Sequence, residues 1–171
     1  HGGIDPGAVD GTANDHIYTE EADRNLDIAL KTGAALVRCG FEVKYSRTGD
    51  TTHPLGDRAA AANAWGADIF LSNHCNGGPD GSTARGIEVF CYYGSTAGLK
   101  LATAIYNRLD DVSPWADRGV KEAGFYVLKY THMPAALTEF GFVNNTDEEA
   151  ALAQPAYRLA LAEAQARGVC D

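Results

Sequence analysis

The segment ADIFLSNHCN, residues 67–76, joins a short apolar run to a cluster of polar side chains. A run of four to eight apolar residues is typical of a strand that is buried on both faces. The run leads directly into His74 and Asn76, and the glycine-rich stretch GGPDGS follows at 77–82. In α/β sheets, reactive side chains gather at such strand ends. The segment therefore predicts a buried strand that delivers His74 to a ligand-binding edge.

The rest of the chain alternates between strand and helix patterns around this segment. Strands are predicted at 41–47, 67–73, 86–92, 125–128 and 135–143, and helices at 20–39, 55–65, 96–109, 147–153 and 155–167. Short apolar strands that alternate with helices favour a largely parallel sheet covered on both faces. The length of 171 residues fits one domain. We therefore predict a single α/β domain over residues 1–171.

Composition limits the partners of this domain. The net charge of −9 argues against nucleic acid, because an acidic surface repels phosphate backbones. The same charge gives no electrostatic attraction to an anionic cell wall. No run of about 18 apolar residues is present, so no membrane insertion is expected. Cys39, Cys75, Cys91 and Cys170 form no C-x-x-C pair, which argues against a structural zinc site and a dense disulfide framework.

Four side chains are candidates for chemistry. His74 ends a strand, and Glu139 lies inside the apolar segment PAALTEFGF, where a carboxylate is costly unless it is paired, protonated or near a metal. His1 lies in the loop HGGIDPG, and Glu21 lies in the first turn of a helix, where the helix dipole alone favours a carboxylate. Two imidazoles and one carboxylate are a known catalytic zinc set with a fourth position for water. Glu139 would then accept the proton of that water.

The sequence resembles the zinc amidases of the amidase-3 type, which occur in bacterial cell-wall hydrolases and phage endolysins. The similarity runs from HGGIDPGAVDG through EEADRNLDIAL, VKYSRTGD, LGDRAAAANAWGADIFLSNHCN and GIEVFCY to GVKEAGFYVLKYTHMPAALTEFGFVNN. Each piece is weak alone, but six pieces in the same order are a strong match. The resemblance implies a sheet of six strands flanked by helices. The first of these strands would precede His1 and is missing from the sequence.

The resemblance also implies an activity and its residues. His1, Glu21 and His74 are expected to bind one Zn²⁺, and Glu139 is expected to act as general base. The expected reaction is hydrolysis of the amide between N-acetylmuramic acid and L-alanine in peptidoglycan, at the bacterial cell wall. Asn76 is expected to orient the substrate, and Cys75 to place a thiol beside the metal. A separate wall-binding domain is a plausible partner, and the source could be an endolysin or an autolysin.

Four other functions remain open at this stage. A zinc peptidase that cleaves within the stem peptide would use the same residues. A copper enzyme could bind metal through the α-amine and imidazole of His1 together with His74. A glycosidase could use Glu21 and Glu139 as paired carboxylates without a metal. A non-catalytic module would bind peptidoglycan and release nothing.

Overall fold

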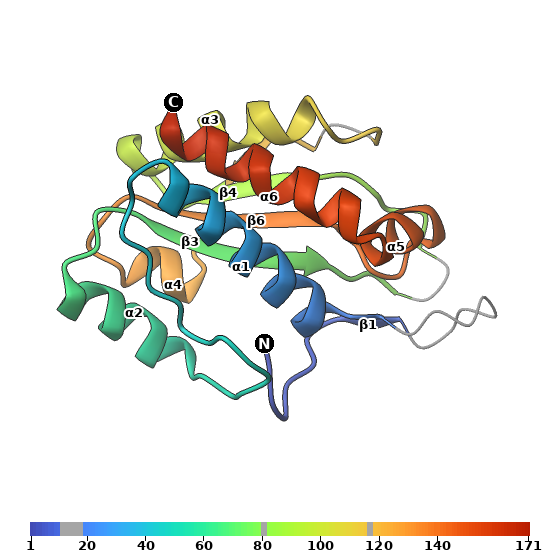
Figure 1. Cartoon of the computed structure of the whole chain (residues 1–171), viewed down its shortest axis with the longest axis horizontal. Helices are drawn as coiled ribbons and strands as arrows, with labels where there is room; N and C mark the ends of the chain where they lie inside the picture. Colours follow the sequence, from blue (N-terminus) through green and yellow to red (C-terminus); the bar gives the residue numbers. More distant parts are fainter. Residues whose placement is uncertain (11–18, 80–81, 116–117) are drawn as a thin grey trace.

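The computed structural model describes residues 1–10, 19–79, 82–115 and 118–171. Its centre is a sheet of four strands in the order β3-β6-β4-β5 (Figure 1). These strands are β3 (Phe70–Asn76), β4 (Glu88–Cys91), β5 (Val120–Glu122) and β6 (Ala135–Phe142). A separate antiparallel pair, β1 (Val9–Asp10) with β2 (Thr19–Glu20), leads into the first helix.

Helices cover both faces of the sheet. They are α1 (Glu21–Arg38), α2 (Leu55–Trp65), α3 (Thr96–Asp110), α4 (Tyr126–Lys129), α5 (Thr146–Ala153) and α6 (Pro155–Cys170). The helices α1 and α6 run side by side across one face, with α3 next to α6 (Figure 1). The short helix α4 packs Val127 and Leu128 against Leu137 on the other face. None of the helices in the described residues is long and apolar enough to cross a membrane.

The main core lies between the sheet and the helices α1, α3 and α6. Its members share almost complete burial, and they include Ile28, Val89, Ile105, Phe140 and Leu161. Burying a side chain of this size contributes about 1.5–3 kcal/mol. This core fixes the sheet from one side, so the polar residues that alternate with it along β3 and β6 must face the other side.

A buried amide ties the central strands to the helices. Gln165 on α6 donates to Asn73 Oδ1 at 2.9 Å and to Thr138 Oγ1 at 3.1 Å, and accepts from Thr32 on α1 at 3.0 Å. Asn73 and Thr138 are register partners on β3 and β6. These bonds satisfy polar groups that would otherwise be buried without partners. They also hold the two strands at the residues that directly precede His74 and Glu139.

The prediction of six mostly parallel strands is confirmed only in part, because the central sheet is a mixed sheet of four strands. Within the described residues, β1 and β2 form a pair outside this sheet, and in the sheet β4 runs antiparallel to β6, whereas β3–β6 and β4–β5 are parallel. The reversal has a simple cause. A parallel neighbour needs a crossover connection, usually a helix, and the described part of the connection at 77–87 contains none.

Two further predicted strands are also wrong. Residues 41–47 join no ladder, because a cavity of about 650 Å³ separates them from β3; a partner strand would have to lie about 4.8 Å away. The predicted strand at 125–128 is the one-turn helix α4. Periodicity cannot distinguish strand from helix in so short an apolar run. The remaining predicted helices and strands are confirmed to within a few residues.

Candidate metal centre

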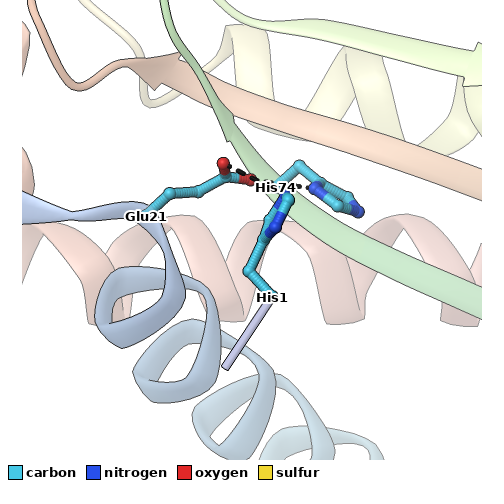
Figure 2. Close-up of side chains that lie close together, drawn as sticks. All are labelled: His1, Glu21 and His74. Carbon is cyan, nitrogen blue, oxygen red and sulfur yellow. Dashed lines mark hydrogen bonds and ion pairs between the residues drawn. The ribbon is translucent and has the colours of Figure 1, made fainter. Parts of the chain in front are cut away.

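His1, Glu21 and His74 meet at one point, although 73 positions separate the first from the last. His1 lies in the N-terminal loop, Glu21 is the first residue of α1, and His74 lies near the end of β3 (Figure 2). One ligand atom from each lies within 4.8 Å of the others. The two imidazole rings stand edge to face with centroids 5.2 Å apart. The structure thus brings together the three side chains that were predicted as metal ligands.

Glu21 contacts both histidines of this cluster. Its side chain is only 4 % exposed. Oε1 lies 2.8 Å from Nδ1 of His74 and accepts from the Asn25 amide at 3.0 Å. Oε2 accepts from the backbone N–H of Ala8 at 2.7 Å and lies 3.3 Å from Nε2 of His1. Burial alone would raise the pKa of Glu21, but the hydrogen bond with His74 and the other contacts lower it overall. The carboxylate is therefore ionised at neutral pH.

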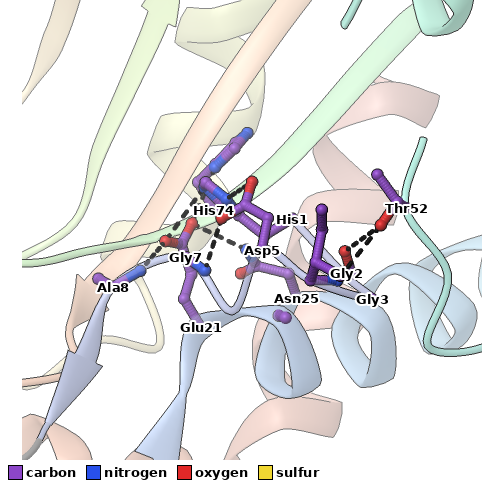
Figure 3. Close-up of polar contacts among 12 residues, drawn as sticks. His1, Gly2, Gly3, Asp5, Gly7, Ala8, Glu21, Asn25, Thr52 and His74 are labelled. Atoms are coloured by element: carbon purple, nitrogen blue, oxygen red, sulfur yellow. Dashed lines mark hydrogen bonds and ion pairs between the residues drawn. The ribbon is translucent and has the colours of Figure 1, made fainter. Parts of the chain in front are cut away.

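Each histidine is oriented by a second polar contact on its other ring nitrogen. Nδ1 of His1 lies 2.8 Å from Asp5 (Figure 3). Nε2 of His74 lies 3.1 Å from the Ser72 hydroxyl. The hydrogen bond with His1 also lowers the pKa of Asp5. Metal-binding histidines generally have such a partner, which fixes the ring and leaves the opposite nitrogen free for the metal.

The loop that carries His1 depends on glycine where it approaches the cluster. Gly7 has φ +76°, and a Cβ atom there would lie 2.5 Å from Glu21 and 2.8 Å from the His1 ring. A side chain at this position would displace both groups. Earlier in the loop, the backbone N–H groups of Gly3 and Ile4 donate hydrogen bonds to the side chains of Asp50 and Thr52. These bonds tie the loop to the segment before α2.

Glu139 lies on β6 directly beside His74, its register partner on β3. Its Oε2 atom is buried and has no hydrogen-bond partner among the described residues. Burial, followed by the negative charges of Glu21 and Glu88, raises the pKa of Glu139 to about 9. A buried carboxyl with an unused oxygen and a perturbed pKa beside a metal-binding cluster is a candidate for proton transfer.

Asn76 and Cys75, which the sequence also singled out, lie on opposite faces of β3. The Asn76 amide donates to Glu88 at 2.7 Å, so it positions a carboxylate, and its predicted role in orienting substrate stays a prediction. The Cys75 side chain is 2 % exposed and packs in the main core. Strand alternation turns it away from His74, so the expected thiol beside the metal is wrong. Burial raises the pKa of this thiol well above its usual value.

The donor set fits a divalent zinc ion. Two imidazole nitrogens and one carboxylate oxygen are a ligand set of catalytic zinc sites, in which a fourth position stays open. The cluster is partly open, because the side chain of His1 is 28 % exposed and that of His74 is 16 % exposed. The three side chains can therefore hold a metal ion that a substrate reaches.

Most residues that support the cluster could not be identified from sequence patterns. Asn25 is one helical turn beyond Glu21, a spacing that places both on one face of α1. Asp5 is an unremarkable loop aspartate, and Ser72 shares a strand face with His74 only once the strand is known. Glu88 was not singled out at all, although a lone carboxylate in the strand GIEVFCY is the same signal that identified Glu139.

Similar proteins place this geometry in a family. The family model described as N-acetylmuramoyl-L-alanine amidase, Amidase_3, matches residues 1–171. The chain is 40 % identical to the amidase CwlM of Bacillus licheniformis over 99 % of its own length and 64 % of that protein. It is 37 % identical to the endolysin of Bacillus phage SPP1, over 100 % of its own length and 62 % of that protein. The chain thus spans slightly under two thirds of these relatives.

A solved structure agrees with this assignment. The N-acetylmuramoyl-L-alanine amidase from Clostridium difficile 630 is 38 % identical and superposes with a TM-score of 0.92, covering 99 % of this chain and 90 % of that one. The family resemblance that was read from the sequence motifs is confirmed. The chain belongs to the Amidase_3 family of N-acetylmuramoyl-L-alanine amidases.

Proposed function

We propose that this chain is the catalytic domain of a zinc-dependent amidase that cleaves the bond between N-acetylmuramic acid and L-alanine in peptidoglycan. The observation that carries the proposal is the meeting of His1, Glu21 and His74 beside the unpartnered carboxyl of Glu139. Family membership supplies the substrate class. The site of action is then the bacterial cell wall, and a separate wall-binding module would compensate for the charge of −9.

His1, Glu21 and His74 would hold the zinc ion, and their partly exposed imidazoles leave the cluster accessible to a substrate. When bound, zinc supplies a Lewis acid that polarises the scissile carbonyl and makes a water molecule more acidic. His1 and His74 are held in place by Asp5 and Ser72, so the ligand set needs little rearrangement to bind.

Glu139 moves the proton. Its free Oε2 accepts a proton from the attacking water and then delivers it to the nitrogen of the leaving L-alanine. A pKa of about 9 in the metal-free protein means that Glu139 holds a proton tightly, which favours delivery to the amine. If His1, Glu21 and His74 held a divalent cation, its positive charge would favour the ionised form of Glu139, which is the form that accepts a proton.

Product analysis tests the proposal. Purified protein is incubated with peptidoglycan, with and without a zinc chelator, and the released peptides are identified by mass spectrometry. We expect peptides with a free L-alanine amino terminus, no release in chelator, and recovery when zinc is added back. New amino termini elsewhere in the peptide would identify a stem-peptide peptidase instead. New reducing sugar ends that persist in chelator would identify a glycosidase.

A pair of histidine variants tests the metal ligands separately from activity. His74→Ala removes a predicted ligand, whereas His132→Ala removes an exposed imidazole outside the cluster. We expect purified wild type and His132→Ala to contain one zinc per chain and His74→Ala to contain little. Full zinc content in His74→Ala would refute the ligand assignment, and stoichiometric copper in place of zinc would favour the copper enzyme.

A further inference from the structure

A third carboxylate continues the line of polar groups across the sheet. Glu139 on β6 is in register with His74 on one side and with Glu88 on β4 on the other. Residues that face each other across neighbouring strands share one face of the sheet. His74, Glu139 and Glu88 therefore form a row that leads from the metal ligands towards β5, across strands about 4.8 Å apart.

Glu88 is buried and fully engaged. Its side chain is 5 % exposed, accepts from Asn76 at 2.7 Å and from Nε of Arg118 at 3.0 Å, and forms an ion pair with Lys121. Burial alone would raise its pKa, but the hydrogen bonds with Lys121, Asn76 and Arg118 lower it overall. Glu88 is therefore a fixed anion that anchors two cations, and it has no free oxygen for a second proton-transfer role.

Lys121 and Arg118 have hydrogen-bond donors that their contacts with Glu88 do not use. Lys121 lies on β5 and Arg118 lies two residues before that strand begins, and their side chains are 40 % and 32 % exposed. Within the described residues, Glu88 is the carboxylate that forms ion pairs with both. The bond from Arg118 uses Nε, which leaves the two terminal nitrogens of the guanidinium for another acceptor. The row thus ends in two cations that share one buried anion.

The direction of the row identifies the part of the substrate that reaches these cations. If Glu139 protonates the leaving nitrogen, the peptide departs on the side of Glu139, away from β3 and towards β4 and β5. The second residue of the stem peptide extends roughly 7 Å beyond the scissile nitrogen, at about 3.3–3.6 Å per residue. The backbone of Lys121 lies two strand spacings from that of Glu139, about 10 Å. Its ammonium reaches back to Glu88, whose strand is one spacing, about 5 Å, from that of Glu139, so the charge lies within reach of the second residue.

We propose that Lys121 and Arg118 form a subsite that binds a free carboxylate of the stem peptide, at the residue that follows the scissile L-alanine. The proposal rests on the proposed amidase function. A carboxylate is the anionic group that stem peptides offer there, and charge-assisted bonds to ammonium and guanidinium groups are among the stronger ones. The subsite selects the peptide on the leaving side of the bond and makes the domain sensitive to amidation of that carboxylate.

Two matched substrates test the subsite. One is a muramoyl dipeptide whose second residue carries a free carboxylate, and the other is the same compound with that carboxylate amidated. For wild type we expect KM to be about tenfold lower for the acid, with similar kcat for both. Lys121→Met should raise KM for the acid to about the value for the amide and leave the amide unchanged. Glu88 keeps Arg118 and Asn76 as partners in this variant, so the fold should survive.

Control variants separate charge recognition from structural damage. Lys121→Arg should retain the preference for the acid, because the charge and its donors remain. Lys100→Met removes an exposed lysine on α3, over the opposite face of the sheet, and should retain the preference as well. An equal loss on both substrates in Lys121→Met, or an unchanged preference for the acid, would overturn the subsite.

A binding measurement keeps the subsite testable apart from catalysis. In the Glu139→Gln background, calorimetry should give a Kd about tenfold lower for the acid than for the amide. This difference should disappear when Lys121→Met is added. Wild-type protein that cleaves neither compound but binds the acid more tightly would refute the amidase function and leave the anionic subsite intact. Cleavage of both compounds with equal affinity would refute the subsite and leave the amidase function intact.

Discussion

Glu139 combines two properties that distinguish a reactive carboxyl from a structural one. Its Oε2 has no partner among the described residues, and its pKa is raised to about 9 by burial and by the charges of Glu21 and Glu88. Glu148 is the natural comparison. It is also buried, but its two oxygens accept from the backbone N–H groups of Gly86 and Phe142, at 2.9 and 2.8 Å. The Glu139 carboxyl has an oxygen that remains available to a ligand, whereas the Glu148 carboxyl holds the backbone at Gly86 and Phe142 in place.

Glu139→Gln should therefore preserve the fold and the zinc content and lower turnover by about 10²–10⁴-fold. The amide has nearly the same size, so packing changes little, but it cannot accept a proton from water. The measurement combines melting temperature, zinc content and peptide release on one preparation.

Glu148→Gln is the matched control for this variant. It should lower the melting temperature, because one of two buried N–H groups meets an amide nitrogen in place of an oxygen. Activity per folded molecule should stay near the wild-type value. If Glu139→Gln instead behaved in this way, losing about 3–5 kcal/mol of stability with normal turnover, Glu139 would be a structural carboxylate.

At the level of single residues, the sequence located the cluster but not its support. His1, Glu21 and His74 carry the motif match, and their chemistry as a set is readable without coordinates. Asp5 and Ser72 act through contacts that exist only after the loop and strand are folded. The hydrogen bond from Asn76 to Glu88 was equally out of reach of the sequence, because it depends on where β3 and β4 lie in the sheet.

At the level of elements, the sequence predicted the helices well and the strands less reliably. The helix α1 has an apolar face at helical spacing over 18 residues, a pattern too long to misread. Residues 41–47 alternate like a strand, but alternation reports burial of one face and not the presence of a ladder partner. The direction of β4 depends on its connection to β3, which local patterns do not encode.

The ends of α1 and α6 supply a prediction at this scale. Cys39 follows α1 and Cys170 ends α6, both are exposed free thiols, and the hydrogen bond with Cys39 is the first cause that raises the pKa of Cys170 to about 11. Treatment with oxidised glutathione at alkaline pH should join them in one disulfide. The closed loop exceeds a hundred residues, for which chain entropy suggests about 4–5 kcal/mol of stabilisation.

Peptide mapping without reductant and melting temperature check this expectation. Cys39→Ser should abolish both the disulfide and the rise in melting temperature. Cys75 and Cys91 are buried and should remain reduced in either protein. A disulfide that involves Cys75 or Cys91, or a mapped Cys39–Cys170 bond that lowers the melting temperature, would show that the two helix ends are not placed as described.

At the level of the whole molecule, the residues that form the core are different from those that form the candidate site. The main core lies between the sheet and α1, α3 and α6, whereas His74, Glu139 and Glu88 lie in register across the strands. Cys75 and Phe140 belong to the core, and their neighbours His74 and Glu139 belong to the site, so the alternation of two strands assigns the two roles. Substitutions on the site face of these strands therefore need not disturb the core.

This separation predicts how the protein responds to loss of metal. A small zinc finger unfolds when its ion is removed, because the ion replaces a core. Here the apolar core does not include the ligands, and without a metal Glu21 still contacts both His1 and His74. Chelation should abolish activity but leave the secondary structure and a cooperative melting transition. The free energy of unfolding should fall only by the binding linkage, about 3–4 kcal/mol for zinc at 100–1,000 times its Kd, and the melting temperature should fall accordingly.

Circular dichroism and thermal melts with and without chelator measure this directly, and His74→Ala provides the internal reference. If the stabilisation by zinc acts through these ligands, chelator should lower the melting temperature of wild type and leave that of His74→Ala unchanged. A similar decrease in both proteins would mean that chelator acts elsewhere on the molecule. Loss of secondary structure in wild type would mean that the ion holds the fold together. The core would then be insufficient by itself, and the assignment of the zinc as purely catalytic would fail.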